Sequence, residues 1–151
     1  MITILCFGNI KNKGLKENCD EFEKRLQIMS EFRTQRISFK PKSTQQNQQE
    51  ILDYLKKYPN KKYILLDEKG KDVTSVELSK KLSTQLVEQE IVFIIGDAKG
   101  FEEEFKKTKA NGFETMRLSK LTLTHEMCEL FLWEQIYRSA MINQGKKYHK
   151  V

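Results

Sequence analysis

The apolar run Ile91–Ile95, which Gly96 ends, constrains the fold more than any other segment of the chain. Five apolar residues in a row, rich in β-branched side chains, are typical of a strand that is covered on both faces of a parallel sheet. A second run, Ile2–Phe7, ends at Gly8 in the same way. Strands of this kind need helices above and below them, so the two runs predict an α/β fold.

Strand-like and helix-like segments alternate along the rest of the chain. Further strands are expected at Arg36–Lys40, Tyr63–Leu66 and Thr115–Leu118, and helices at Leu15–Met29, Thr44–Tyr58, after Thr74, at Phe101–Ala110 and at Glu126–Asn143. Asp67–Gly70 is predicted to be a turn. The alternation predicts a mostly parallel sheet with helices on both faces. The 151 residues contain no linker and no repeat, so we expect a single domain, residues 1–151.

The chain carries a formal net charge of +6, which modestly favours a polyanionic partner such as RNA. An ordinary lysine-rich surface explains the charge equally well, because Glu and Lys are interleaved. No apolar run approaches the ~20 residues that span a bilayer, and the first residues lack the features of a signal peptide. We therefore expect a cytoplasmic protein in which Cys6, Cys19 and Cys128 stay free thiols.

Three strand ends are candidates for ligand binding, since open parallel sheets bind ligands at the carboxyl ends of their strands. They are Leu66-Asp67, Ile95-Gly96 and Leu118-Ser119. Each taken alone is more simply an ordinary turn. The segment Gly96–Gly100 matches neither a Walker P-loop nor G-x-G-x-x-G, and His125 and His149 lack the spacing of a zinc site, so no metal is expected.

The segment Leu118–Glu126 alternates leucines with hydroxyl side chains between a strand and an apolar helix. Small hydroxyls among leucines suit a pocket for a neutral purine base. The alternative is a buried crossover whose hydroxyls bond its own backbone. Composition does not separate the two interpretations.

Four motifs in order resemble the RlmH family of SPOUT-class methyltransferases. They are Ile-Ile-Gly at 94–96 with Gly100, Leu-Ser-Lys-Leu-Thr-Leu-Thr-His-Glu-Met at 118–127, Glu-Gln-Ile-Tyr-Arg at 134–138 and Tyr-His-Lys at 148–150. The strand ending in Gly8 and Leu-Leu-Asp-Glu-Lys-Gly at 65–70 fit as well. Each motif is weak alone, but the ordered set is specific and covers the whole chain.

The resemblance implies a trefoil knot near the C-terminus, with S-adenosylmethionine bound in it. By position, the cofactor pocket would be lined by Leu66, Gly96, Leu118, Ser119, Lys120, Leu121, Thr122 and Leu123. The family works as a homodimer in which the cofactor of one subunit faces the tail of the other. Its substrate is a pseudouridine in a stem-loop of 23S rRNA, methylated at N3 in the assembled ribosome.

The resemblance also implies a function for the basic C-terminal tail, residues 146–151. His149 would be the general base or would position one, Tyr148 would stack on a base, and Lys150 with Arg138 would contact the RNA. A buried or interfacial role for Arg138 is an equal alternative. For His125, at the start of the last helix, a structural role is favoured over catalysis.

The chain departs from the family pattern at four positions. Asp97 stands where a second glycine is usual, Lys99 where the residue is uncharged or acidic, Glu129 where arginine is common, and Lys147 where proline is frequent. These departures keep two alternatives open: a related methyltransferase with another RNA target, and a non-catalytic RNA- or ribosome-binding protein. A flavodoxin-like protein is disfavoured because the phosphate-binding loop is absent.

Overall fold

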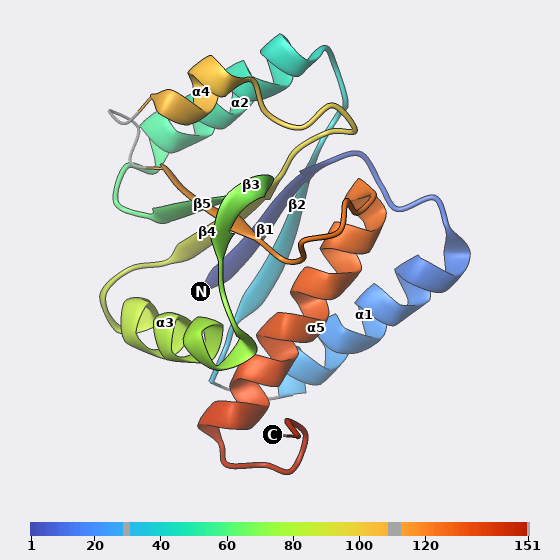
Figure 1. Ribbon diagram of the computed structural model, residues 1–151, viewed down its shortest axis with the longest axis vertical. Helices are drawn as coiled ribbons and strands as arrows, with labels where there is room; N and C mark the ends of the chain where they lie inside the picture. Colours follow the sequence, from blue (N-terminus) through green and yellow to red (C-terminus); the bar gives the residue numbers. More distant parts are fainter. Residues whose placement is uncertain (29–30, 109–112, 151) are drawn as a thin grey trace.

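The computed structural model describes residues 1–28, 31–108 and 113–150. Five strands form one parallel sheet in the order β2-β1-β4-β3-β5 (Figure 1). The strands are β1 (Ile2–Phe7), β2 (Thr34–Phe39), β3 (Lys62–Asp72), β4 (Ile91–Ile95) and β5 (Phe113–Arg117). The helices are α1 (Lys13–Ile28), α2 (Thr44–Lys57), α3 (Ser75–Glu88), α4 (Glu103–Lys107) and α5 (His125–Asn143).

Helices cover both faces of the sheet, which confirms the predicted fold class. Figure 1 shows α1, α3 and α5 on one side of the sheet, and α2 and α4 on the other. The apolar core is divided in the same way, because alternate residues of a strand point to opposite faces. Ile2, Ile4 and Phe93 pack toward α1, α3 and α5, whereas Leu5 and Ile94 pack toward α2 and α4.

Strand β4 lies at the centre of the sheet, between β1 and β3. All five of its residues are buried, as the apolar run Ile91–Ile95 predicts. The carboxyl ends of β4 and β3 are in register, with Leu66 beside Ile95. The two strand ends therefore open onto the same edge of the sheet.

Side-chain caps set the starts of three helices. Ser43 and Gln46 form a capping box at the glutamine-rich start of α2, and Thr74 with Glu77 forms the predicted box at α3. The Thr124 hydroxyl accepts from the amide of Met127 and caps α5.

The predicted turn at Asp67–Gly70 is wrong, because β3 continues to Asp72. Its pairing with β5 is interrupted by a register shift between Leu66 and Lys71. A Cβ at Gly70 would lie 2.6 Å from the carbonyl carbon of Met116, so only glycine fits this close approach. The glycine that suggested a turn is thus needed within a strand.

Other boundaries also differ from prediction. Strand β2 begins at Thr34 and ends at Phe39, whereas Arg36–Lys40 was expected. Helix α4 is only Glu103–Lys107, because Phe101 precedes it and stacks on Phe105. Met29 and residues 109–110 lie outside the described residues. The trefoil knot stays a prediction.

All three cysteines are free; Cys6 and Cys19 are buried and Cys128 is half-buried. Within the described ranges, every helix is too short or too polar to cross a membrane.

Candidate active site

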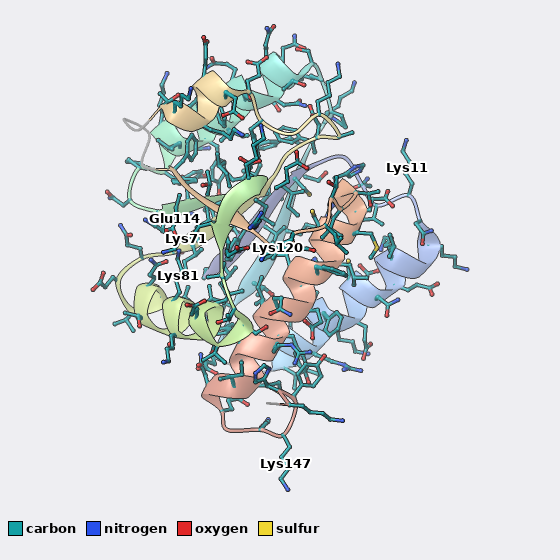
Figure 2. The ribbon with its side chains drawn as sticks, viewed as in Figure 1. Lys11, Lys71, Lys81, Glu114, Lys120 and Lys147 are labelled. Atoms are coloured by element: carbon teal, nitrogen blue, oxygen red, sulfur yellow. The ribbon has the colours of Figure 1, made fainter. Side chains whose placement is uncertain are left out.

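A cavity of about 730 Å³ opens at the carboxyl edge of the sheet. Its walls come from the segments that follow β3, β4 and β5, together with the start of α5. Seven of the eight residues predicted to bind the cofactor line it: Leu66, Gly96, Leu118, Ser119, Leu121, Thr122 and Leu123. Lys120, labelled in Figure 2, is exposed and is not among the lining residues. The fold thus brings together three strand ends, each of which resembles an ordinary turn when its sequence is taken alone.

The hydroxyls of the segment before α5 are partly used within the protein. Ser119 Oγ accepts from the amide of Leu121 (2.9 Å), and Thr124 caps α5. Thr122 Oγ1 donates to Glu68 Oε2 (3.3 Å). The hydroxyls therefore bond the backbone and β3, while Leu118 and Leu123 still face the cavity. The hydroxyls partly bond the backbone, as the crossover interpretation predicted, but the segment is not buried, because Lys120, Leu121 and Thr122 are exposed.

The loop after β4 forms a tight turn against the cavity. Gly100 has φ +71° and donates its amide to the carbonyl oxygen of Asp97 (2.9 Å). A Cβ at Gly96 would lie 3.2 Å from the ring of Phe101 and 3.3 Å from Cα of Gly100. Glycine at position 96 therefore lets the loop close while its backbone borders the cavity.

Sequence reasoning missed an ion pair in the cavity wall. Lys106 of α4 donates from Nζ to Asp67 Oδ2 (2.8 Å) and to Glu103 Oε1 (2.7 Å). Burial by itself lowers the pKa of Lys106, but the bonds to Asp67 and Glu103 outweigh it and the net shift is upward. Asp67 directly follows Leu66, which was predicted to bind the cofactor. This adjacency in the sequence could have identified Asp67 as a residue of the site. The ion pair between Lys106 and Asp67 holds α4 against β3 at the residue that follows Leu66.

The charge reversal at Glu129 is balanced within the fold. Glu129 is buried on α5, and its carboxylate accepts from Arg36 Nε (2.5 Å) and Nη2 (3.1 Å) of β2. Arg36 also donates to the carbonyl oxygen of Gly8 (3.0 Å). Glu129 is therefore a packing residue that joins α5 to the sheet, and its charge does not reach the surface.

The tail residues predicted to act on the substrate form a second cluster with α5. Arg138 Nη1 lies 3.3 Å from His149 Nδ1, and its guanidinium lies 4.8 Å from the ring centre of Tyr148. Glu134 accepts from Arg138 Nη2 (2.5 Å) and from the Tyr148 hydroxyl (3.0 Å). Burial and the nearby charge of Glu134 raise the pKa of Tyr148. Lys150 is exposed beside this cluster.

The tail cluster and the cavity lie at opposite ends of α5. His125 lines the cavity, while Arg138 lies thirteen residues further on, about 20 Å along the helix axis. Figure 2 shows the same separation: Lys11, whose amide binds Glu126 at the start of α5, and Lys147 of the tail lie far apart. Within one chain, His149 therefore does not meet the cavity.

A family described as "Predicted SPOUT methyltransferase" matches residues 1–149. The chain belongs to the SPOUT methyltransferase family. This confirms the family that the ordered motifs predicted.

Similar SPOUT relatives include two proteins named "Ribosomal RNA large subunit methyltransferase H". The one from Geotalea daltonii is 33% identical over 98% of both chains. The one from Cytophaga hutchinsonii is 35% identical over 94% of both. Among solved structures, a ribosomal RNA small subunit methyltransferase E from Neisseria gonorrhoeae, bound to S-adenosyl methionine, aligns at 13% identity and a TM-score of 0.47, covering 95% of this chain and 65% of that one.

Proposed function

We propose that this protein is an S-adenosylmethionine-dependent methyltransferase that methylates N3 of pseudouridine 1915 in 23S rRNA of the assembled ribosome. The observation that carries the proposal is the cavity at the carboxyl edge of the sheet, lined by seven residues of the family's motifs in a chain of this family. The relatives' names supply the class of substrate.

The cavity suits S-adenosylmethionine in size and lining. Its volume falls within the range of about 300–1,000 Å³ that is usual for small-molecule sites. Leu66, Leu118 and Leu123 offer apolar contact to an adenine ring, and the Gly96 backbone allows close approach. These residues would hold the cofactor, which supplies a methyl group already activated on a sulfonium.

Because the methyl is activated, the protein has two remaining tasks. It must align the pseudouridine ring with the cavity, and it must accept or relay the imide proton at N3. We propose that His149 accepts this proton. Its Nδ1 lies near Arg138, and Glu134 holds Tyr148 beside it. Tyr148, Arg138 and Lys150 then hold the nucleotide and its phosphates.

The position of the tail supports a homodimer. His149 and the cavity lie at opposite ends of α5 in one chain, so a site that uses both needs the tail of a second copy. The apolar character of α5 supports such an interface: Phe131 is exposed on it, and Leu130 and Cys128 are half-buried. We infer in addition a single SPOUT domain with a C-terminal trefoil knot, located in the cytoplasm.

The experiment that tests the substrate compares 23S rRNA from wild-type and deletion strains by mass spectrometry. N3-methylpseudouridine should vanish in the deletion strain and return when the gene is restored. An unchanged level would refute the proposed target.

Another RNA target was the main alternative, raised by Asp97, Lys99 and Glu129. Glu129 is now accounted for by Arg36, and Asp97 is bonded within the protein (Thr44 and Asn47 donate to it). Of these three residues, Lys99 is the one that is exposed, and it lines the cavity. The structure therefore offers little reason to prefer a different target.

A further inference from the structure

The start of α2 buries polar side chains that are not part of the helix cap. Asn47 and Gln48 are only 3% and 6% exposed. Together with Thr44 they lie three and four residues apart, which places them on one face of the helix. Buried amide groups require hydrogen-bond partners, so this face must meet other polar groups.

The partners lie in the loop that forms one wall of the cavity. Asn47 Nδ2 and Thr44 Oγ1 both donate to Asp97 Oδ2, at 3.0 and 3.1 Å. Further along the loop, Gln48 Oε1 accepts from the amide of Glu102 (2.8 Å), and Gln48 Nε2 donates to the Glu102 carboxylate (3.1 Å). Helix α2 therefore holds the loop near both of its ends.

Both oxygens of Asp97 are occupied by the protein. Oδ2 binds the first turn of α2, where the helix dipole favours a carboxylate, and Oδ1 accepts from the amide of Lys99 (2.8 Å). The residues between the anchor points Asp97 and Glu102, which are residues 98–101, line the cavity, as do Gly96 and Asp97. The aspartate that replaces a usual family glycine is thus the group by which α2 sets the conformation of the cavity wall.

We infer that Thr44, Asn47 and Gln48 are positioning residues for the cofactor, acting through Asp97 and Glu102 on the loop at 96–101. This inference rests on the proposed function, because the cavity must bind S-adenosylmethionine. The residues touch the loop and not the ligand. Their removal should weaken cofactor binding and leave the chemical step intact once the cofactor is saturating.

The test measures the Kd of S-adenosylmethionine by calorimetry, and KM and kcat on ribosomes. Asn47→Ala should raise Kd and KM for the cofactor about tenfold, the effect of one hydrogen bond to a charged group. Asp97→Ala also removes the bonds from Thr44 and from the Lys99 amide, so it should raise both constants by more. The kcat should stay within about twofold of wild type. The Asn47→Ala/Asp97→Ala double variant should bind the cofactor no more weakly than Asp97→Ala, because Asp97→Ala already removes the bond from Asn47.

Two control substitutions isolate the effect. Gln49→Ala changes the neighbouring, exposed glutamine, which bonds only Asp53, and should leave Kd unchanged. Thr44→Ser keeps the hydroxyl and should bind like wild type, whereas Thr44→Ala should not.

Two results would overturn the inference. One is a wild-type Kd in folded Asn47→Ala and Asp97→Ala. The other is a fall in kcat that matches the loss of affinity. If wild-type protein itself binds no S-adenosylmethionine, the proposed function fails first and the inference fails with it.

Discussion

At the scale of single residues, α5 holds the tail side chains to which the proposed function assigns a role. Glu134, Arg138 and Tyr148 form one hydrogen-bonded and stacked cluster, and Tyr137 packs edge-on against Tyr148 at 5.0 Å between ring centres. The bond from Glu134 is the main cause that raises the pKa of Arg138. Arg138 therefore stays charged, and its side chain fixes the ring of His149.

We expect His149→Ala to lower methyl transfer far more than cofactor binding. Loss of a general base costs about 100-fold or more in rate, while the cavity does not include this residue. The measurement is kcat on ribosomes beside the calorimetric Kd of S-adenosylmethionine. Gln144→Ala, at the exposed base of the tail, is the control. Equal losses in both quantities would mean that His149 supports the fold alone.

Stability should fall in alkaline solution because of Cys6. Burial, with a smaller effect from the charge of Glu129, raises the pKa of this thiol from 9.0 to about 12. Between those values the unfolded chain releases a proton that the folded chain keeps, so the free energy of unfolding decreases as pH rises above 9. The loss from this thiol is about 1 kcal/mol by pH 10.

Urea unfolding at pH 8 and pH 10 measures this loss. Cys6→Ala should show a smaller difference between the two pH values, whatever its absolute stability. Cys128→Ala should reduce the difference by less than Cys6→Ala does, because burial raises the pKa of the Cys128 thiol too, but not as far as that of Cys6. A Cys6→Ala protein with an undiminished difference would assign the effect to other groups.

At the scale of elements, the sheet edge at β5 combines close packing with charge. Glu114 on this edge strand is held by Lys81 of α3 and by Lys62 of β3, and Lys71 lies near them in Figure 2. Charged side chains at an edge discourage pairing with another chain. Gly70 lets β3 lie close to the edge strand β5, because the Gly70 backbone passes within contact distance of the Met116 backbone.

Gly70→Ala should therefore reduce the free energy of unfolding by about 2 kcal/mol, since the new methyl group overlaps the backbone of β5. Gly14→Ala is the matched control, because its Cβ meets only Asn12 Oδ1 at 3.4 Å within α1. Alanine at that helical position should raise stability by up to about 1 kcal/mol. Chemical denaturation compares the two, and a neutral Gly70→Ala would contradict the tight β3–β5 approach.

At the scale of the whole molecule, the separation of tail and cavity leads us to predict that activity needs two chains. Gly96→Val should block the cavity, because any Cβ there meets Phe101 and Gly100, and His149→Ala should remove the tail function. Each homodimer should be inactive. Mixed dimers contain one cavity and one tail that are both intact, so an equal mixture should recover about a quarter of wild-type activity.

The measurement is methyl transfer after subunit exchange, with circular dichroism to show that both variants are folded. Dilution below the dimer dissociation constant should also abolish wild-type activity. A site within one chain predicts no recovery in the mixture and an active monomer.

Local patterns in the sequence determined most of the elements and the family. The buried run Ile91–Ile95, the capping residues Thr74 and Thr124, and the ordered motifs after Gly96 depend on neighbours in the chain, so their outcome was predictable. The same patterns identified seven residues of the cavity wall. Lys120 is next to them in the sequence, yet its side chain is exposed.

Contacts between distant segments were decided only by the tertiary structure. The continuation of β3 through Gly70 depends on Met116, and the bonds of Asp97 depend on Asn47, fifty residues away. Glu129 stands where the family commonly has arginine, and only the fold places Arg36 beside it. The distance of His149 from the cavity is likewise a matter of helix length and packing. The periodicity of apolar residues predicts which face of a helix or strand a residue lies on. The partner that the residue contacts there depends on how the whole chain folds.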